Sequence, residues 1–257
     1  MSAPAICVLK TDGINCDGEM DFAFENAQAQ PDVVHVNQLR SGERRFADYG
    51  ALVIPGGFSY GDDIASGKVL ANELTSYLSD QLLEFVHQDK PILGVCNGFQ
   101  VLARTGLLPS RTLGEQQVSL AQNSNGRFDR RWIELSVSDS ICEFVSAKDF
   151  DEATIPMEIA HGEGRFVASD NTLQSLEDNG QLVFRYAPSE LVADPYNPNG
   201  SMHDIAGICD ESGLILGMMP HPERSIAAMH PYRARTEAAY QAATVIFRNI
   251  VDFARSA

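Results

Sequence analysis

One cysteine of the chain lies between two glycines, in the sequence GVCNG at residues 94–98. The apolar run from Pro91 to Val95 predicts a buried strand before Cys96, and the residues after it predict a helix that closes near Gly106. Glycines two residues on either side of a nucleophile permit the tight strand-to-helix turn that presents a strained side chain above a sheet. The N-terminus of the predicted helix after Cys96 carries a partial positive charge, which favours the thiolate form of that cysteine. The pattern therefore predicts a nucleophile at Cys96, against the alternative of a buried structural cysteine.

A second group of chemically capable residues follows the apolar run Leu214 to Met218. His221 stands between Pro220 and Pro222, which exclude a helix and hold the chain extended. Residues i and i+2 of an extended chain point the same way, so the carboxylate of Glu223 can reach the His221 ring. Alone, the pair would indicate a loop histidine beside a solvated glutamate. Together with a nucleophile elsewhere, it predicts a general base and the acid that orients it.

The remaining cysteines and histidines do not indicate a metal or disulfide framework. The five cysteines are odd in number and irregularly spaced, with no CxxC pair: Cys7, Cys16, Cys96, Cys142 and Cys209. A His-x-Glu pair can begin a metal site, but no further ligand cluster accompanies this one, so no metal is predicted. This cysteine usage is typical of a reducing compartment, and we expect a cytoplasmic location.

Composition excludes several classes of partner. The 257 residues carry a formal net charge of −16, with 44% hydrophobic and 21% charged residues, as in an ordinary globular protein. Such an acidic chain repels phosphate backbones, so nucleic acid is not expected as a partner. Residues 1–10 are too short and interrupted for a signal peptide, and no apolar run approaches a membrane span.

Short apolar runs alternate with helical patterns, which is typical of an α/β fold with a mostly parallel central sheet flanked by helices. The predicted strands are Ala5–Leu9, Val33–Val36, Ala51–Ile54, Pro91–Val95, Trp132–Val137, Gln181–Tyr186, Ile205–Ile208 and Leu214–Met218. Helices are expected over Asp17–Ala29, over Glu73–Gln88, after Cys96 and over Ala234–Ala254. The middle of the chain is polar and irregular, and no interdomain linker or repeat is visible. We therefore expect one domain over residues 1–257.

The two chemical patterns together resemble the class I glutamine amidotransferases, through GVCNGFQ at residues 94–100 and PHPE at 220–223. Further motifs resemble the glutaminase subunits of phosphoribosylformylglycinamidine synthase: NCD at 15–17, PGGFSYGD at 55–62, AHGEGRF at 160–166, PNGS at 198–201 and GMMPHPER at 217–224. The motifs occur in order over most of the chain. Phe99 also fits this family, since many other class I members carry histidine before the glutamine.

This resemblance implies a flavodoxin-like glutaminase. By the family's pattern, Cys96 attacks the side-chain amide of L-glutamine, and His221 protonates the leaving ammonia and then activates water. The backbone amides of Gly57 and Asn97 would form the oxyanion hole, as expected for the N–H that follows a nucleophile in such a turn. The resemblance also implies substrate-binding residues: Gln100, His161 and Gly162. For His161 a purely structural role is an equal alternative.

The resemblance also implies a divided enzyme. Forming phosphoribosylformylglycinamidine requires ATP, yet the chain has no P-loop. In the nearest segment, Gly61 to Lys68, the spacing between glycines is one residue too long and Val69 replaces the required hydroxyl residue. No cofactor is therefore expected in this chain, and ATP and Mg²⁺ are expected on a large synthetase partner, with a small accessory subunit.

Two other classes of function remain as alternatives. A cysteine hydrolase or a stress-related member of the same fold group would commonly carry histidine directly after the cysteine, where this chain has Asn97. A non-enzymatic binding module would not need all three members of the triad.

Overall fold

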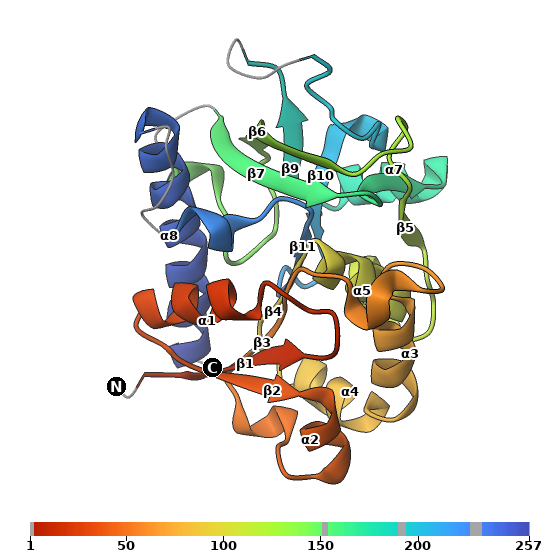
Figure 1. The fold of residues 1–257 in the computed structure, drawn as a ribbon, viewed down its shortest axis with the longest axis vertical. Coiled ribbons are helices and arrows are strands. Elements are labelled where there is room, and N and C mark those ends of the chain that lie inside the picture. The colour runs from red at the N-terminus through yellow and green to blue at the C-terminus, as the bar shows by residue number, and fades with distance from the viewer. Residues whose placement is uncertain (1–2, 151–153, 190–193, 227–232, 257) are drawn as a thin grey trace.

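The structure is a computed structural model that describes residues 3–150, 154–189, 194–226 and 233–256. Its centre is a nine-stranded sheet in the order β2-β1-β3-β4-β11-β10-β9-β6-β7 (Figure 1). Buried apolar residues from all of these strands and from the flanking helices form one continuous hydrophobic cluster. The predicted α/β fold with a mostly parallel central sheet is confirmed.

Five strands form the parallel part of the sheet. They are β2 (Gln30–His35), β1 (Ala5–Lys10), β3 (Ala51–Ile54), β4 (Ile92–Val95) and β11 (Ile215–Met218). Strands β3, β4 and β11 are buried along their whole length, as expected for strands covered by helices on both faces. Their carboxyl ends meet at one edge of the sheet, which is where α/β proteins bind their ligands.

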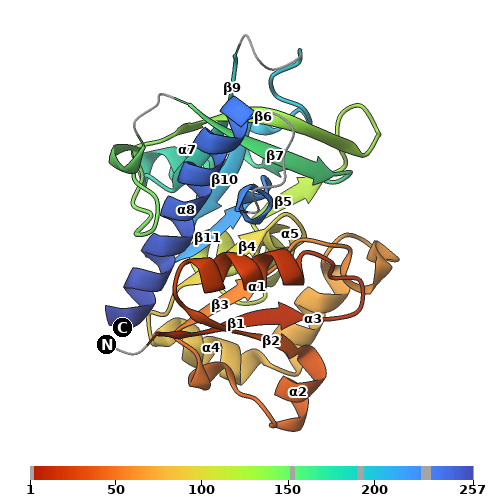
Figure 2. The same ribbon diagram turned by 60° about the vertical axis from the view of Figure 1, so that its left-hand side comes forward.

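The other four strands extend the sheet in antiparallel fashion. They are β10 (Ile205–Cys209), β9 (Leu182–Ala187), β6 (Asp129–Val137) and β7 (Ile155–His161). A separate small sheet pairs β5 (Val118–Ala121) with β8 (Arg165–Ala168). In both views β6 and β7 lie beyond the end of the parallel strands, so residues of β7 reach the edge where the carboxyl ends meet (Figures 1 and 2).

Helices cover both faces of the parallel part. Helices α1 (Asp17–Asn26) and α8 (Arg233–Ser256) pack against each other on one side, whereas α3 (Lys68–Ser76) packs against α5 (Asn97–Thr105) on the other (Figure 2). The remaining helices are α2 (Val36–Ser41), α4 (Ser79–His87), α6 (Leu107–Ser110) and α7 (Asp170–Asp178).

Two sequence-based predictions need correction, and some elements were not predicted. The single helix expected over Glu73–Gln88 is two helices, because the chain leaves helical geometry at Leu78, where φ is −116° and ψ is 9°. Val36 begins α2 rather than ending β2. Strand β7 was not predicted, because all seven of its residues are buried and no alternation of polar and apolar residues marks it. Strand β8 and helix α7 in the same irregular stretch were also missed.

Candidate active site

The turn between β4 and α5 places Cys96 in a strained conformation, with φ of 52° and ψ of −104°. A positive φ is rare for a residue with a side chain and is found where surrounding structure enforces it. The flanking glycines have no room for a Cβ, which would lie 2.7 Å from the carbonyl oxygen of Gly98 at Gly94, and 1.8 Å from that of Ile54 at Gly98. The turn is therefore the tight strand-to-helix turn that the sequence predicts.

Cys96 is held at the junction of both halves of the sheet. Its backbone N–H donates to the carbonyl of Met218 in β11 at 2.8 Å, and its Sγ lies 3.6 Å from the carbonyl oxygen of Ala160 in β7. The residue is only 5% exposed, so the thiol is reached through a narrow opening.

His221 is buried beside Glu223, as the i, i+2 spacing predicts. Nδ1 of His221 lies 2.6 Å from Oε1 of Glu223, and each residue is 1% exposed. Because a carboxylate only accepts, Nδ1 carries the proton and Nε2 is the nitrogen left for chemistry. The backbone N–H of His221 donates to the carbonyl of Glu158 in β7 at 2.8 Å. The histidine is thus fixed through both its ring and its main chain.

The protonated form of His221 is stabilised. Burial lowers the pKa of this imidazole, but the charge of Glu223 and the adjacent sulfurs of Cys96 and Cys16 outweigh burial and hold the pKa well above its usual range. Nε2 has no hydrogen-bond partner among the described residues. The arrangement stores a proton next to the candidate nucleophile.

The two predicted oxyanion-hole residues lie on adjoining turns. Asn97 is the first residue of α5, where an N–H has no acceptor within the helix. Gly57 follows β3 with φ of +146°, and a Cβ there would lie 2.7 Å from Cα of Ile14. The Asn97 side chain joins these turns, since its Oδ1 accepts from the N–H of Ser59 at 3.2 Å. From the sequence a role is expected only for the Asn97 main chain, and no spacing pattern indicates this side-chain contact.

The predicted glutamine-binding residues line one small pocket of about 120 Å³ next to Cys96. Gln100 enters it from α5, and its Nε2 donates to the carbonyl of Glu163 at 2.5 Å while its Oε1 accepts from Asn97 at 2.9 Å. Gly162 follows the end of β7. The fold therefore brings His161 and Gly162 to Cys96 and Gln100, which lie one helical turn apart in a distant part of the chain.

His161 has a clear structural environment. Its Nδ1 donates to Oδ1 of Asn123 at 3.1 Å, and Asn123 Nδ2 donates back to the His161 carbonyl at 2.9 Å. A Cβ at Gly164 would lie 2.3 Å from the ring, so glycine is required there. Burial and the charge of His221 lower the pKa of His161 to about 4, which keeps its ring neutral at pH 7. This packing favours the structural alternative, while the ring still lines the pocket.

A second thiol, that of Cys16, lies beside the histidine. Donor atoms of Cys16, His221 and Glu223 lie within 4.8 Å of one another and are buried, which is a set that could hold a metal ion. However, His221 and Glu223 already bond to each other, and Nη2 of Arg224 donates to Cys16 Sγ at 3.5 Å. A fixed positive charge next to the thiol opposes a cation, so the arrangement favours a hydrogen-bonded network. No spacing pattern in the sequence indicates this approach of Cys16.

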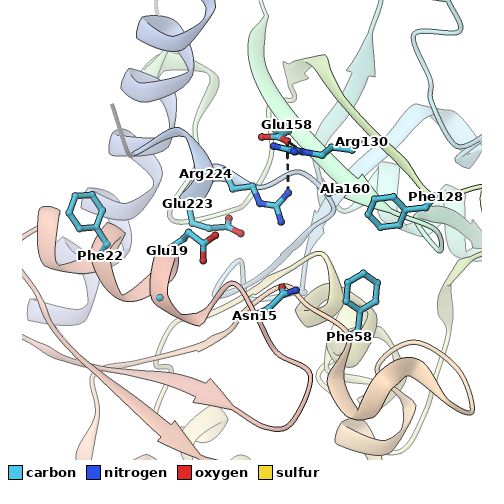
Figure 3. Close-up of a pocket in the computed structure, with 11 residues that line it drawn as sticks. Asn15, Glu19, Phe22, Phe58, Phe128, Arg130, Glu158, Ala160, Glu223 and Arg224 are labelled. Atoms are coloured by element: carbon cyan, nitrogen blue, oxygen red, sulfur yellow. Dashed lines mark hydrogen bonds and ion pairs between the residues drawn. The ribbon is translucent and has the colours of Figure 1, made fainter. Parts of the chain in front are cut away.

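An open groove of about 780 Å³ adjoins the site and includes Glu223 (Figure 3). On its lining, the buried carboxylate of Glu158 forms an ion pair with Arg130 and lies 3.9 Å from Nη1 of Arg224. Three aromatic side chains on the groove, Phe22, Phe58 and Phe128, are each about half exposed. Among the residues that the structure describes, none of the helices combines the length and apolar character needed to span a bilayer.

Comparison with known proteins also indicates a glutamine amidotransferase. Residues 3–254 match the family model described as the CobB/CobQ-like glutamine amidotransferase domain. A phosphoribosylformylglycinamidine synthase subunit PurQ from Methanococcus maripaludis is 42% identical, over 97% of this chain and 97% of that protein. The corresponding protein from Treponema denticola is 41% identical, over 87% of this chain and 88% of its own length.

Solved structures of glutamine amidotransferases are also similar to this chain. A structure described as PurLQS from Thermotoga maritima contains a chain that is 31% identical, with a TM-score of 0.75, over 98% of this chain and 99% of that one. A glutamine amidotransferase from Thermotoga maritima is 18% identical with a TM-score of 0.54, over the whole of both chains, and shares the fold. The expectation drawn from the motifs is thereby confirmed: the chain belongs to the glutamine amidotransferases and, among them, to the family of phosphoribosylformylglycinamidine synthase subunits.

Proposed function

We propose that this chain is the glutaminase of a phosphoribosylformylglycinamidine synthase and that Cys96, His221 and Glu223 are its catalytic triad. The observation that carries the proposal is the buried 2.6 Å pair of His221 and Glu223 beside a cysteine whose φ is +52°. A nucleophile, a base and a group that orients the base are the parts required for covalent acyl transfer. We further propose one domain over residues 1–257, in keeping with the continuous sheet and core.

In the first half-reaction the Cys96 thiolate attacks the side-chain amide carbon of glutamine. The oxygen of the tetrahedral intermediate accepts from the N–H groups of Gly57 and Asn97. As the thiolate charge is consumed, one of the charges that raises the pKa of His221 disappears, so the imidazolium releases its proton more readily. That proton goes to the leaving nitrogen, the C–N bond breaks, and ammonia departs from a glutamyl thioester.

In the second half-reaction neutral His221 takes a proton from water, which attacks the thioester. The C–S bond breaks, glutamate leaves, and the thiolate–imidazolium pair is restored. Glu223 holds Nδ1–H and so keeps Nε2 directed at the reacting atoms. The sum is glutamine plus water giving glutamate plus ammonia. Gln100, His161 and Gly162 are proposed to line the bound glutamine, and no metal is proposed in this chain.

The ammonia is used elsewhere in this proposal. A large synthetase subunit would supply the ATP and Mg²⁺ chemistry, with a small accessory subunit. The similarity to a chain of the PurLQS structure supports an assembly of several subunits. The five free cysteines are compatible with a reducing, cytoplasmic location. Because free ammonia is wasted, we expect the isolated chain to be a slow glutaminase that the loaded synthetase accelerates.

The decisive experiment measures glutamate release by the chain alone and with a synthetase subunit, formylglycinamide ribonucleotide, ATP and Mg²⁺. We expect strong acceleration by the loaded partner, and a glutamine-like diazoketone should label Cys96, as located by peptide mass spectrometry. Cys16, which also lies beside His221, is the internal control for selective labelling. Full activity without the partner, ATP-dependent amidotransfer by this chain alone, or labelling at Cys16 instead would each contradict the proposal.

A further inference from the structure

Two cavities meet at the candidate site. The 120 Å³ pocket contains Cys96, and the 780 Å³ groove opens to solvent. They share three lining residues, Phe58, Phe128 and Ala160. Because Cys96 is 5% exposed, any substrate that reaches it from the groove must pass these shared residues.

The two aromatic residues contact each other at this boundary. The centroids of the Phe58 and Phe128 rings are 6.2 Å apart with an interplanar angle of 36°, which is within the range of interacting aromatic pairs. Figure 3 shows the rings facing each other at one end of the groove, with Phe22 at the opposite end. Phe58 is 43% exposed and Phe128 54% exposed, which is unusual for large apolar side chains that pair.

Each ring lies next to a residue that is predicted to bind the substrate. Phe58 directly follows Gly57, and its backbone N–H is fixed by the carbonyl of Gly13 at 2.8 Å. Phe128 precedes β6, and a Cβ at Gly162 would lie 4.0 Å from the Phe128 ring. The main chain of Phe58 is thus anchored, and both side chains, each about half exposed, border solvent on one side.

We propose that Phe58 and Phe128 form the entrance to the glutamine pocket and determine which molecules reach Cys96. The rings part to admit a slender carboxamide side chain and then close over it, while bulkier reagents are excluded. Closure also removes bulk water from around the amide, which strengthens the hydrogen bonds of the oxyanion site. The inference rests on the proposed function, because it treats the pocket at Cys96 as the glutamine site.

The test measures how fast Cys96 is alkylated by a small reagent, iodoacetamide, and by a bulky one, N-(1-pyrenyl)maleimide, with sites located by peptide mass spectrometry. In Phe128→Ala we expect the bulky reagent to react about tenfold faster or more, with little change for iodoacetamide, because only passage of the larger molecule is limited by the ring. Phe22→Ala is the matched control, since Phe22 is 49% exposed on the same groove but does not line the pocket.

Kinetics with the partner-bound enzyme give a second readout. Phe128→Ala should raise KM for glutamine more than it lowers kcat, and Phe128→Leu, which keeps an apolar side chain of intermediate size, should fall between alanine and the native residue. Equal acceleration of both reagents, no acceleration of the bulky one, or the same effect in Phe22→Ala would overturn the proposal. Alkylation reports only access to the thiol, so this result is separate from the labelling and coupling tests of the proposed function.

Discussion

Cys96 and His221 are positioned in opposite ways, although both lie at the carboxyl ends of neighbouring strands. The conformation of Cys96 is enforced by a short segment, in which Gly94 and Gly98 permit a turn that no other residue would fit. His221 is held instead by hydrogen bonds, with its ring on the neighbouring Glu223 and its main chain on the carbonyl of Glu158, which is remote in sequence. A strained turn fixes the nucleophile, and hydrogen bonds to a neighbouring side chain and to a distant strand fix the base.

This difference indicates which substitutions are tolerated around Cys96 and which around His221. A strained turn fails whenever its own residues change, because the close contacts lie within the segment and its neighbouring strand. A side chain held by remote contacts loses position gradually as each contact is removed, because the others remain. Mutations in the two regions should therefore separate effects on stability from effects on rate.

The largest expected effect is loss of a reacting group. Cys96→Ser and His221→Ala should each lower glutamine hydrolysis by roughly 10⁴-fold or more, because the groups act as a unit. The double variant should be little worse than either single variant. Ammonia release in the presence of the synthetase measures this, and circular dichroism checks that each variant is folded. A double variant that multiplies the two losses would show that the groups act independently.

Replacing glycine by alanine in each region should affect stability in one region and catalytic rate in the other. Gly98→Ala places a Cβ 1.8 Å from the Ile54 carbonyl oxygen, so we expect a loss of about 3 kcal/mol in the free energy of unfolding. Gly56→Ala places one 2.7 Å from Cε1 of His221, a side-chain atom rather than backbone, so the clash displaces the ring from Glu223 and the expected loss is about 100-fold in kcat with a smaller loss of stability.

Denaturant unfolding and steady-state kinetics of the two alanine variants make this comparison. Gly18→Ala is the control, because a Cβ there meets nothing within 4 Å. Equal losses of stability in Gly56→Ala and Gly98→Ala would contradict the distinction between the two regions.

The orienting role of Glu223 has a signature in the pH profile. Burial lowers the pKa of His221 and the charge of Glu223 raises it, so Glu223→Gln should lower that pKa. Because the imidazolium form is lost as pH rises through the pKa, the alkaline limb of kcat/KM should move to lower pH in this variant. The rate at the optimum should fall by roughly 10²- to 10³-fold, less than for His221→Ala. An unmoved alkaline limb, or a loss greater than that of His221→Ala, would refute this role.

The last expected effect leaves the reaction unaddressed and concerns acid stability at His161. Its pKa is lowered from 6.5 to about 4 by burial and by His221, so the unfolded chain binds this proton more readily than the folded chain. The stability contributed by neutral His161 is present above pH 6.5 and is lost as pH falls toward 4, by up to about 3 kcal/mol. His161→Asn keeps a donor for Asn123 Oδ1 and removes the titration. Unfolding at several pH values should show a weaker acid dependence in the variant; parallel curves would contradict the assignment.

The sequence by itself determined the nucleophile turn, the His221–Glu223 pair and most of the parallel strands. Each depends on residues adjacent in the chain: glycines around Cys96, prolines around His221, and apolar runs such as Ala51–Ile54, which the structure reproduces. Local backbone restriction and i, i+2 geometry are properties of short segments, so short segments reveal them. The family resemblance added the pocket residues as a set, and the fold brings that set to Cys96.

Tertiary structure alone decided the rest. Strand β7 carries no periodic signal because both of its faces are buried, yet its Glu158 and Ala160 carbonyls contact His221 and Cys96. The thiol of Cys16 beside His221 and the pairing of Phe58 with Phe128 join segments that no local pattern connects. Such contacts depend on how the antiparallel strands are placed over the end of the parallel sheet, and that placement arises from packing of the whole core rather than from any one segment.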